Sequence, residues 1–177
     1  SFDAYVVTVF FSARLARGDK ELRVKSWLVQ SLDADPDHPY QLANEIAADE
    51  LRDGSVTGNT EDTLQKLLSE TLPYHAAIAA DRGLQLMMYE GGTHVVGFGA
   101  QMDDEDLTSF FEQLNYSSKM GTLYSELLAG WQMISEQPFN AFVDVYRPGK
   151  WGSWGALRHL GDDNPRWEVL TKGCQAC

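Results

Sequence analysis

Residues 84–98 have the sequence LQLMMYEGGTHVVGF, a short apolar run that is interrupted at Tyr89, Glu90 and two glycines. The run is too short for a helix and the glycines mark a loop, so the pattern predicts a buried strand over 84–90. Such a strand would place the carboxylate of Glu90 at its C-terminal end. In α/β enzymes the active site lies at the C-terminal ends of the parallel strands, so Glu90 is the first candidate for a functional residue.

A predicted helix leads directly into this strand. Thr60 is suited to an N-cap, and Glu61 and Asp62 are acids placed where the helix dipole favours them. Apolar residues then follow at helical spacing up to Arg82 and Gly83, a cation and a glycine typical of a helix C-terminus. A helix that passes so directly into a strand is typical of a parallel βαβ unit.

Two further strands are predicted on either side of this unit. Residues 2–12, FDAYVVTVFFS, are rich in β-branched and aromatic side chains and predict a strand buried on both faces. Residues 139–146, FNAFVDVY, predict a third strand. Further helices are expected around 24–32, over 42–51, from 103–106 onwards and over 118–135. With no hairpin signal between the strands, the predicted fold class is α/β, with parallel strands alternating with helices.

The composition fits one domain and limits its partners. At 177 residues and 44% hydrophobic residues, the chain is long enough for a single domain, 1–177, with its own core. It has 26 Asp and Glu against 14 Lys and Arg, a formal net charge of -12, which disfavours nucleic acid and anionic membranes as partners. No run of about 18 apolar residues is present to span a bilayer. A neutral glycan remains compatible with this charge.

The cysteines and histidines predict no metal or redox site. Cys174 and Cys177 form a C-x-x-C without the helix start that activates a thiol or the further soft ligands that zinc requires. Their disulfide state therefore stays open. His94 follows Glu90 by four residues, which is no metal-ligand spacing on a strand. We predict no metal and no cofactor, and neither a phosphate-binding glycine loop nor a nucleophile elbow is present.

Carboxylates and aromatic residues are expected to meet where the strands end. If the strands are parallel neighbours, the ends near Glu90 and Asp144 lie at one edge of the sheet, beside the glycine-rich and aromatic loop 147–155. Sugars pack their C–H faces on aromatic rings, and paired carboxylates cleave glycosidic bonds, so this set predicts carbohydrate chemistry. Glu90 is the catalytic candidate. The substrate-binding candidates are Tyr89, His94, Asp144, Tyr146, Trp151 and Trp154.

Structural roles stay open for the same residues. Glu90 could cap a helix or pair with an arginine at the end of its strand. Trp151 and Trp154 could pack a loop over the core, and His94 could be a positioning residue or a polar residue with satisfied hydrogen bonds.

Two motifs of the chain resemble a known family. YEGGTH at 89–94, preceded by a helix and an aliphatic strand, is the first, and KWGSWGALRHLGDDNPRWEVL at 150–170 is the second. Together they resemble the C-terminal part of (β/α)8-barrel proteins related to retaining glycoside hydrolases. The resemblance covers most of the chain at the level of pattern.

This resemblance implies a fold and a set of roles. Residues 2–12, 84–90 and 139–146 would correspond to strands six to eight, so that the chain would hold the last three βα units of a TIM-type barrel. Glu90 would be the nucleophile at the end of the seventh strand. Trp151 and Trp154 would shape a sugar subsite.

The chain departs from the family in what it lacks. A retaining mechanism needs two carboxyl groups about 5 Å apart, and strands one to five with their acid/base Glu have no counterpart. Asn44 and Glu45 match the Asn-Glu pair of that acid/base strand, but they lie in a segment with helical spacing. A complete barrel takes about 250 residues. We therefore expect a fragment that lacks the N-terminal barrel half, or an assembly such as a homo-oligomer that covers the open sheet edges.

Three functions stay open at this point. The first is a glycosidase with Glu90 as its nucleophile, and the second is a glycan-binding protein without turnover. The third is a protein-assembly domain that uses the sheet edge and the Trp-rich loop. If the first holds, we expect a secreted or periplasmic protein, whereas the sugar and its linkage are not predicted.

Overall fold

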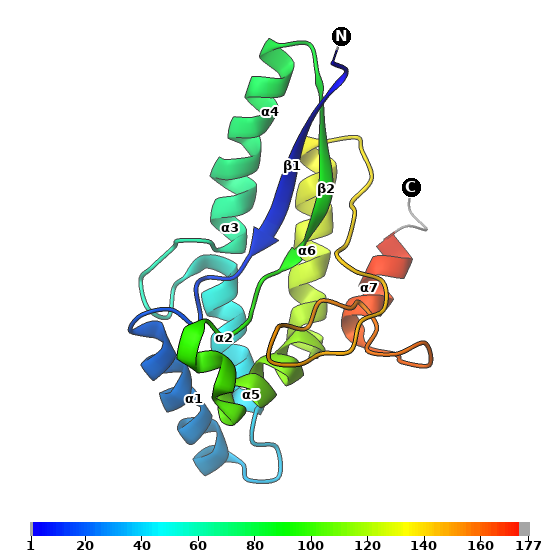
Figure 1. Cartoon of the computed structure of the whole chain (residues 1–177). Helices are drawn as coiled ribbons and strands as arrows, with labels where there is room; N and C mark the ends of the chain where they lie inside the picture. The colour runs from blue at the N-terminus through cyan, green and yellow to red at the C-terminus, as the bar shows by residue number, and fades with distance from the viewer. Residues whose placement is uncertain (1, 174–177) are drawn as a thin grey trace.

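A computed structural model describes residues 2–173 as a small parallel sheet with helices packed against it (Figure 1). The sheet contains β1 (Ala4–Phe11) and β2 (Gln85–Thr93). The helical elements are α1 (Lys20–Ala34), α2 (Gln41–Asp53), α3 (Leu64–Lys66), the π-helical turn η1 (Leu67–Thr71), α4 (Leu72–Asp81), the 3₁₀ turn η2 (Gly99–Asp103), α5 (Glu105–Asn115), α6 (Ser118–Ile134) and α7 (Pro165–Gly173). Cys174 and Cys177 lie outside the described residues.

The parallel βαβ unit that the sequence predicts is confirmed. β1 and β2 pair in parallel from Ala4 and Gln85 onwards. The chain between them forms α1, α2, α3, η1 and α4, and α4 leads directly into β2. The predicted N-cap is wrong, because Thr63 takes that place and its hydroxyl accepts a hydrogen bond from the Lys66 amide. Asp62 has a left-handed φ of 57°, so the helix cannot start before Thr63.

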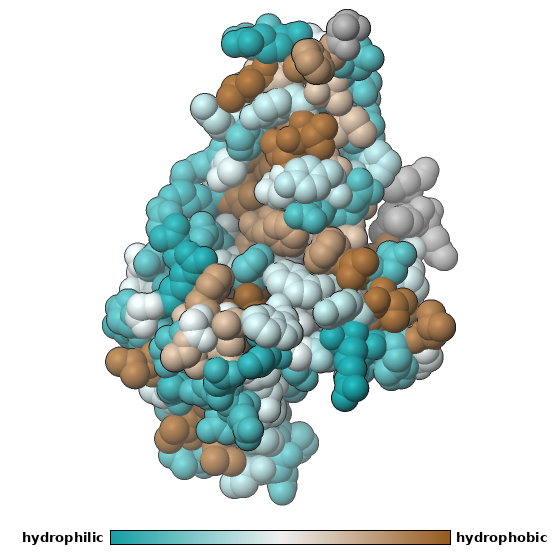
Figure 2. All heavy atoms as spheres, in the orientation of Figure 1, coloured by the Kyte–Doolittle hydropathy of each residue, from teal (hydrophilic) through white to brown (hydrophobic). Residues whose placement is uncertain are grey.

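The two faces of the sheet have different surroundings. Val9 and Phe11 are buried in the core, where the helices cover one face of β1. Val6 points to the opposite face and is 47% exposed, because the helices lie behind and beside the strands in Figure 1. The prediction that this strand is buried on both faces is therefore wrong. In the same view, Figure 2 shows apolar and polar side chains intermixed over the strands.

The second strand is longer than predicted. It continues through Gly91 and Gly92 to Thr93, so Glu90 lies inside β2 and not at its end. The glycines are needed for close packing: a Cβ on Gly91 would lie 2.6 Å from the carbonyl oxygen of Val9, and one on Gly92 would lie 2.6 Å from a tyrosine hydroxyl of α6. The glycine pair therefore serves strand pairing and packing, where the sequence pattern suggested a loop.

The predicted third strand, 139–146, does not form as a regular strand. Gly91 donates a backbone hydrogen bond to the Asn140 carbonyl, and Phe142 donates one to the Gly91 carbonyl, which makes a single parallel bridge to β2. The Phe142–Val143 peptide bond is cis. Beyond it, the amide of Val143 bonds to Trp154 within the same loop and no longer to β2. The third segment therefore lies beside β2 for only a few residues.

α5 and α6 complete the core on the helical side of the sheet. The apolar face of α5 includes Phe110 and Leu114, and that of α6 includes Leu123 and Leu127, all of which are fully buried. Asp104 and Ser117 act as N-caps for the two helices. Among the helices described in residues 2–173, none combines the length and the hydropathy that crossing a membrane requires.

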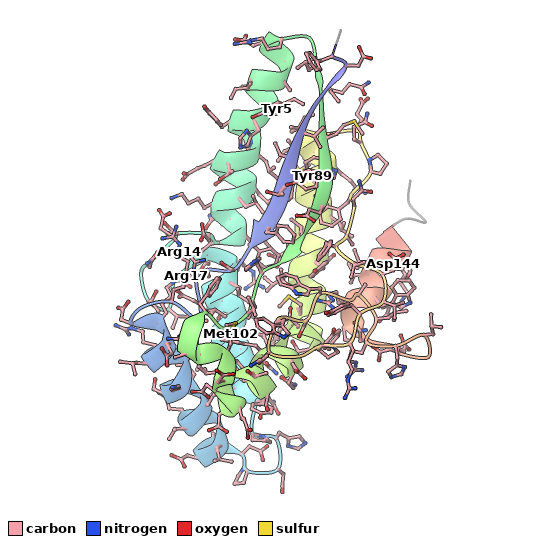
Figure 3. All side chains as sticks on the ribbon, viewed as in Figure 1. Tyr5, Arg14, Arg17, Tyr89, Met102 and Asp144 are labelled. Atoms are coloured by element: carbon pink, nitrogen blue, oxygen red, sulfur yellow. The ribbon has the colours of Figure 1, made fainter. Side chains whose placement is uncertain are left out.

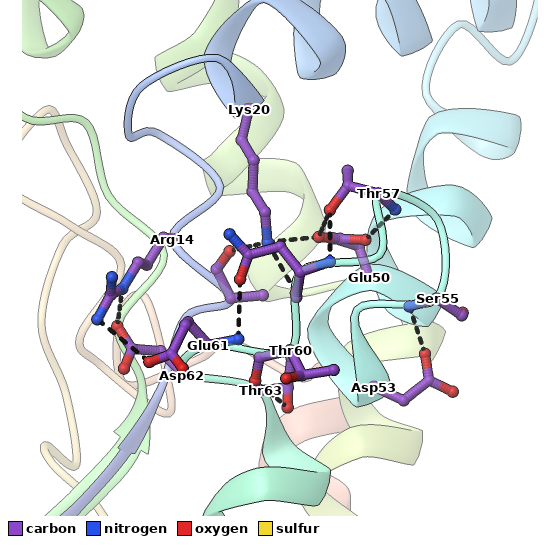
Figure 4. A network of polar contacts seen from close by, with 12 residues as sticks. Arg14, Lys20, Glu50, Asp53, Ser55, Thr57, Thr60, Glu61, Asp62 and Thr63 are labelled. Atoms are coloured by element: carbon purple, nitrogen blue, oxygen red, sulfur yellow. Dashed lines mark hydrogen bonds and ion pairs between the residues drawn. The ribbon is translucent and has the colours of Figure 1, made fainter.

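A buried ion pair fixes the loop that follows β1 (Figure 4). The ammonium of Lys20 lies 2.5 Å from a carboxylate oxygen of Glu50, and both side chains are almost completely buried. Lys20 also donates to the carbonyls of Ala13, at 2.6 Å, and Asn59, at 3.3 Å. Glu50 accepts hydrogen bonds from the amide and hydroxyl of Thr57. These contacts join the loop after β1 to α1, α2 and the segment that precedes α3.

Candidate functional site

Three segments meet at the C-terminal ends of β1 and β2. They are the end of β1 itself, the residues that follow β2, and the loop that lies beside β2. The ring of Phe10, in β1, lies 6.0 Å from the ring of His94 and 6.5 Å from that of Trp154, both edge to face. His94 and Trp154 are themselves 5.1 Å apart. Phe98 stacks on His94 at 5.9 Å, and Phe142 contacts Trp154 at 6.0 Å. We call Phe10, His94, Phe98, Phe142 and Trp154 the strand-end aromatic cluster.

His94 is the centre of this cluster. Its backbone amide continues the sheet by donating to the Phe11 carbonyl at 2.8 Å. Its imidazole contacts three aromatic rings, yet its ring nitrogens make no hydrogen bond within residues 2–173. The imidazole is only partly buried, so both nitrogens are positioned by apolar packing and remain free to bond a polar ligand.

Glu90 lies on the same face of the sheet as Phe10. A register shift after Val7 leaves Tyr89 without a partner in β1 and pairs Glu90 with Thr8. Paired residues point to the same side of a sheet, as do residues two apart in one strand, so Glu90, Thr8 and Phe10 share the face without helices. The carboxylate of Glu90 is half-buried and makes no hydrogen bond or ion pair within residues 2–173.

The other predicted site residues are placed less closely. Tyr89 is 60% exposed over the strands, and Figure 3 shows Asp144 well to the side, on the loop next to α7. Trp151 is 62% exposed and its carbonyl accepts a hydrogen bond from the Trp154 indole at 2.8 Å. Tyr146 is half exposed and has no ring contact with the cluster. Of the predicted set, only His94 and Trp154 belong to the strand-end aromatic cluster.

The loop that holds Trp154 is anchored by a buried arginine of α7. Arg166 is 1% exposed and donates to the carbonyls of Ser153, at 3.0 Å, and Gly155. Its guanidinium also lies over the rings of Tyr116, at 4.6 Å, and Tyr124, at 5.7 Å. Arg166 therefore fixes the residues on both sides of Trp154, which positions the indole against His94.

A carboxylate at the end of this loop has a strongly perturbed pKa. Asp162 accepts hydrogen bonds from the Arg158 guanidinium, at 2.5 and 2.9 Å, from the Arg158 amide and from Asn164. The hydrogen bonds from Arg158 hold the pKa of Asp162 well below its ordinary value of 3.8. Because the folded pKa is depressed, the ionised carboxylate stabilises the folded state above the unfolded pKa, and this contribution is lost as the pH falls through the folded pKa.

Replacing Asp162 with Asn is therefore expected to have a pH-dependent cost. At pH 7 the variant should lose about 1–2 kcal/mol of unfolding free energy, because Arg158 is partly solvated and the pair is screened. The difference from the unsubstituted protein should narrow between about pH 5 and pH 3, where the unfolded carboxylate protonates. Urea unfolding of both proteins at several pH values measures it. A difference that stays constant down to pH 3 would contradict the assigned role.

The sequence prediction missed four residues of the site: Phe10, Phe98 and Phe142 of the cluster, and Arg17. Phe98 lies beyond the Glu-Gly-Gly motif with no pattern around it that distinguishes a ligand contact from core packing. Arg17 lies in the loop after β1, and its guanidinium is centred 4.0 Å over the Phe98 ring. The pairing of β1 with β2 brings this loop next to the segment that follows β2.

Other parts of the molecule are weaker candidates for a functional site. A groove of about 580 Å³ between α2, α3 and α6 is mainly apolar. Its charged lining residues include Arg52 and Glu126, which pair with each other at 3.0 Å. Asn44 is buried in α2, while Glu45 pairs with Lys119, so the Asn-Glu pair is not at a strand end. Within residues 2–173 no group of three or more His, Cys, Asp or Glu side chains could hold a metal ion.

The strand-end aromatic cluster, with Glu90 on the adjoining sheet face, is thus the candidate site. It combines ring faces, an imidazole with free nitrogens and a half-buried carboxylate without a partner in residues 2–173. Neither a family model, nor a curated protein, nor a solved structure matches this chain, so the resemblance to glycoside-hydrolase barrels stays a prediction.

Proposed function

We propose that this chain is a glycoside-hydrolase-like, carbohydrate-active protein that binds a glycan at the strand-end aromatic cluster, with Glu90 as the candidate nucleophile. The main support is the position of His94, which packs among Phe10, Phe98 and Trp154 at the C-terminal ends of two parallel strands. In open α/β sheets that end of the strands is where ligands bind.

The chemistry of the cluster suits a sugar. The C–H faces of a pyranose pack on aromatic rings, and its hydroxyls need hydrogen-bond partners close to the rings. Trp154 and Phe98 supply ring faces, while His94 supplies nitrogens that have no partner within residues 2–173. Trp151 is 62% exposed and Tyr146 is 49% exposed. We propose that these two rings of the loop bind further sugar units.

The barrel interpretation accounts for the bare face of the sheet, which is the face that no helix covers. We propose that β1, β2 and the short bridge at Ala141 are strands six to eight of a TIM-type barrel, with the helices on its outer side. Glu90 would then point into the barrel. A retaining mechanism needs a second carboxyl group about 5 Å from the nucleophile. We propose that the N-terminal barrel half, or another chain that covers the bare face, supplies this group.

Replacing Trp154 with Ala tests the binding half of the proposal. We expect affinity for a neutral hexasaccharide to fall at least about tenfold, because a ring face of the cluster is lost. Titration calorimetry with a panel of β-1,4-glucose, β-1,4-mannose, β-1,4-xylose and α-1,4-galactose hexamers gives the measurement. Tyr74→Ala is the matched control, since it removes an exposed ring from α4 on the helical side. Equal losses in both variants, or no binding by the unsubstituted protein, would contradict the proposal.

Replacing Glu90 with Gln tests the catalytic half. 2,4-Dinitrophenyl glycosides are suitable substrates, because their leaving group departs without protonation and so needs only the nucleophile. We expect the unsubstituted chain to release dinitrophenolate and the Gln variant to be slower by about two orders of magnitude. Glycan binding by the Gln variant should stay intact. Equal rates for the two proteins would remove Glu90 from this role.

A protein-assembly role is the second candidate. The bare sheet face exposes Val6, at 47%, and Phe142, at 41%, and β1 has no strand on its outer side in the described part of the chain. Open strand edges tend to pair with other chains. Light scattering during gel filtration distinguishes the cases: a stable oligomer that dissociates with Val6→Lys favours assembly, and a monomer at all concentrations opposes it.

A further inference from the structure

Arg17 is an exposed cation next to the candidate site. It lies in the loop between β1 and α1, beyond the C-terminal end of β1, and Figure 3 shows it next to Arg14. Arg14 is paired with Asp62 at 2.7 Å. Arg17 is exposed and forms no ion pair or side-chain hydrogen bond within residues 2–173, although the chain has 26 acidic residues.

The Arg17 guanidinium is held in place by an aromatic ring of the candidate site. Its central carbon lies 4.0 Å from the centre of the Phe98 ring, and Phe98 stacks on His94 at 5.9 Å with an angle of 20° between the rings. His94 in turn contacts Trp154. A guanidinium that lies over a ring keeps its N–H groups at the rim, where they can bond to an anion. Arg17 thus adds a cation to one end of the aromatic cluster.

We infer that the glycan bound by this site carries a carboxylate, as a uronic acid unit does, and that Arg17 binds this group. The inference rests on the proposed glycan-binding function and specifies its ligand. A planar guanidinium matches a carboxylate with two parallel hydrogen bonds, and the sugar ring of the same unit would lie towards Phe98 and His94. A single carboxylate is favoured over a polyanion, because the chain as a whole is negative and would repel a densely charged polymer.

The loop geometry supports this role for Arg17. The backbone of the loop is fixed by hydrogen bonds from Ser12 and Ala13 to the Asp62 carbonyl, at 3.0 and 2.8 Å, and by the buried ammonium of Lys20. An arginine on a fixed loop loses less freedom when it binds a ligand than one on a mobile segment. Arg17 is therefore placed at one end of the site, next to the ring faces on which the sugar would pack.

The test compares matched ligands and matched variants. Each neutral hexasaccharide that binds is paired with the same chain in which one terminal hexose is the corresponding uronic acid, and both affinities are measured by calorimetry at low salt. The variants are Arg17→Met, which keeps an apolar contact with Phe98, and Arg82→Met. Arg82 is also exposed and without an ion pair in the described chain, but it precedes β2 and so lies at the opposite end of the sheet.

We expect the unsubstituted protein to bind the acidic member of a pair about tenfold more tightly than the neutral one. Arg17→Met should reduce this ratio to about one, and Arg82→Met should keep the ratio. A ratio near one in the unsubstituted protein, or a preference that survives in Arg17→Met, would overturn the inference and leave glycan binding intact. Failure of every glycan to bind would overturn both.

Discussion

Replacing Lys20 with Met is expected to destabilise the protein by about 3–5 kcal/mol, since it leaves the Glu50 carboxylate buried without its counter-charge. The ammonium also bonds to the carbonyls of Ala13 and Asn59, which would lose a donor. Thr57 alone would then bond to the carboxylate. Urea unfolding followed by circular dichroism measures the change.

A double replacement separates the ion pair from the packing around it. Lys20→Met combined with Glu50→Leu removes both charges, and it should recover part of the lost stability because no unpaired charge remains in the interior. Lys172→Met is the exposed control: its pair with Glu168 lies on the surface and should be worth less than about 1 kcal/mol. A cost for Lys20→Met no larger than that of the control would show that the buried pair has no structural role.

Arg166→Met is expected to lower both stability and glycan affinity. The side chain is buried, so its removal leaves the carbonyls of Ser153 and Gly155 without a charged donor and should cost about 3 kcal/mol or more. Tyr116 still donates to Gly155 at 3.1 Å, which limits the loss at that carbonyl. Because these carbonyls flank Trp154, the indole should lose its fixed position and affinity should fall about tenfold.

The two effects of Arg166→Met are measured separately. Thermal and urea unfolding report the stability, and calorimetry with the tightest neutral hexasaccharide reports the affinity at a temperature where the variant is folded. Arg82→Met is again the control, as an exposed arginine without an ion pair among the described residues. A folded Arg166→Met protein with unchanged affinity would mean that this arginine does not position the Trp154 loop.

Much of the fold could be predicted from the sequence where the apolar pattern is regular. Helix α6 was predicted over 118–135 and is observed over Ser118–Ile134. Helix α5 was predicted from the acidic start at 103–106, and Asp104 is its N-cap. These helices bury one apolar stripe, so spacing alone defines them.

The prediction failed where tertiary contacts override the local pattern. In the sequence, Gly91 and Gly92 are typical of a loop, but in the structure they continue β2. Glycine is needed at both positions because side chains there would collide with Val9 and Tyr124. The run 139–146 has strand propensity, but its backbone groups beyond Phe142 bond within its own loop. Neither outcome depends on neighbouring residues in the sequence, so a local pattern cannot predict it.

Part of the candidate site could be predicted, because the sequence indicates parallel strands. Parallel strands bring the residues that follow them to one end of a sheet, and His94 and Trp154 meet there. Glu90 was placed at the strand end, whereas it lies three residues before it, beside the bulge at Tyr89. Arg17 could not be found from the sequence, because its role depends on a ring contact across two loops.

The most direct test of glycan binding at the strand-end aromatic cluster is the indole resonance of Trp154 during titration with a neutral hexasaccharide. The chain has five tryptophans, so a ¹⁵N–¹H spectrum resolves each indole, and Trp154→Ala assigns the one of interest. We predict a saturable shift of the Trp154 signal, whose indole donates to Trp151, while the buried Trp27 and Trp131 stay unchanged. Binding without any shift of Trp154, or with shifts confined to Trp27 and Trp131, would contradict the proposed site.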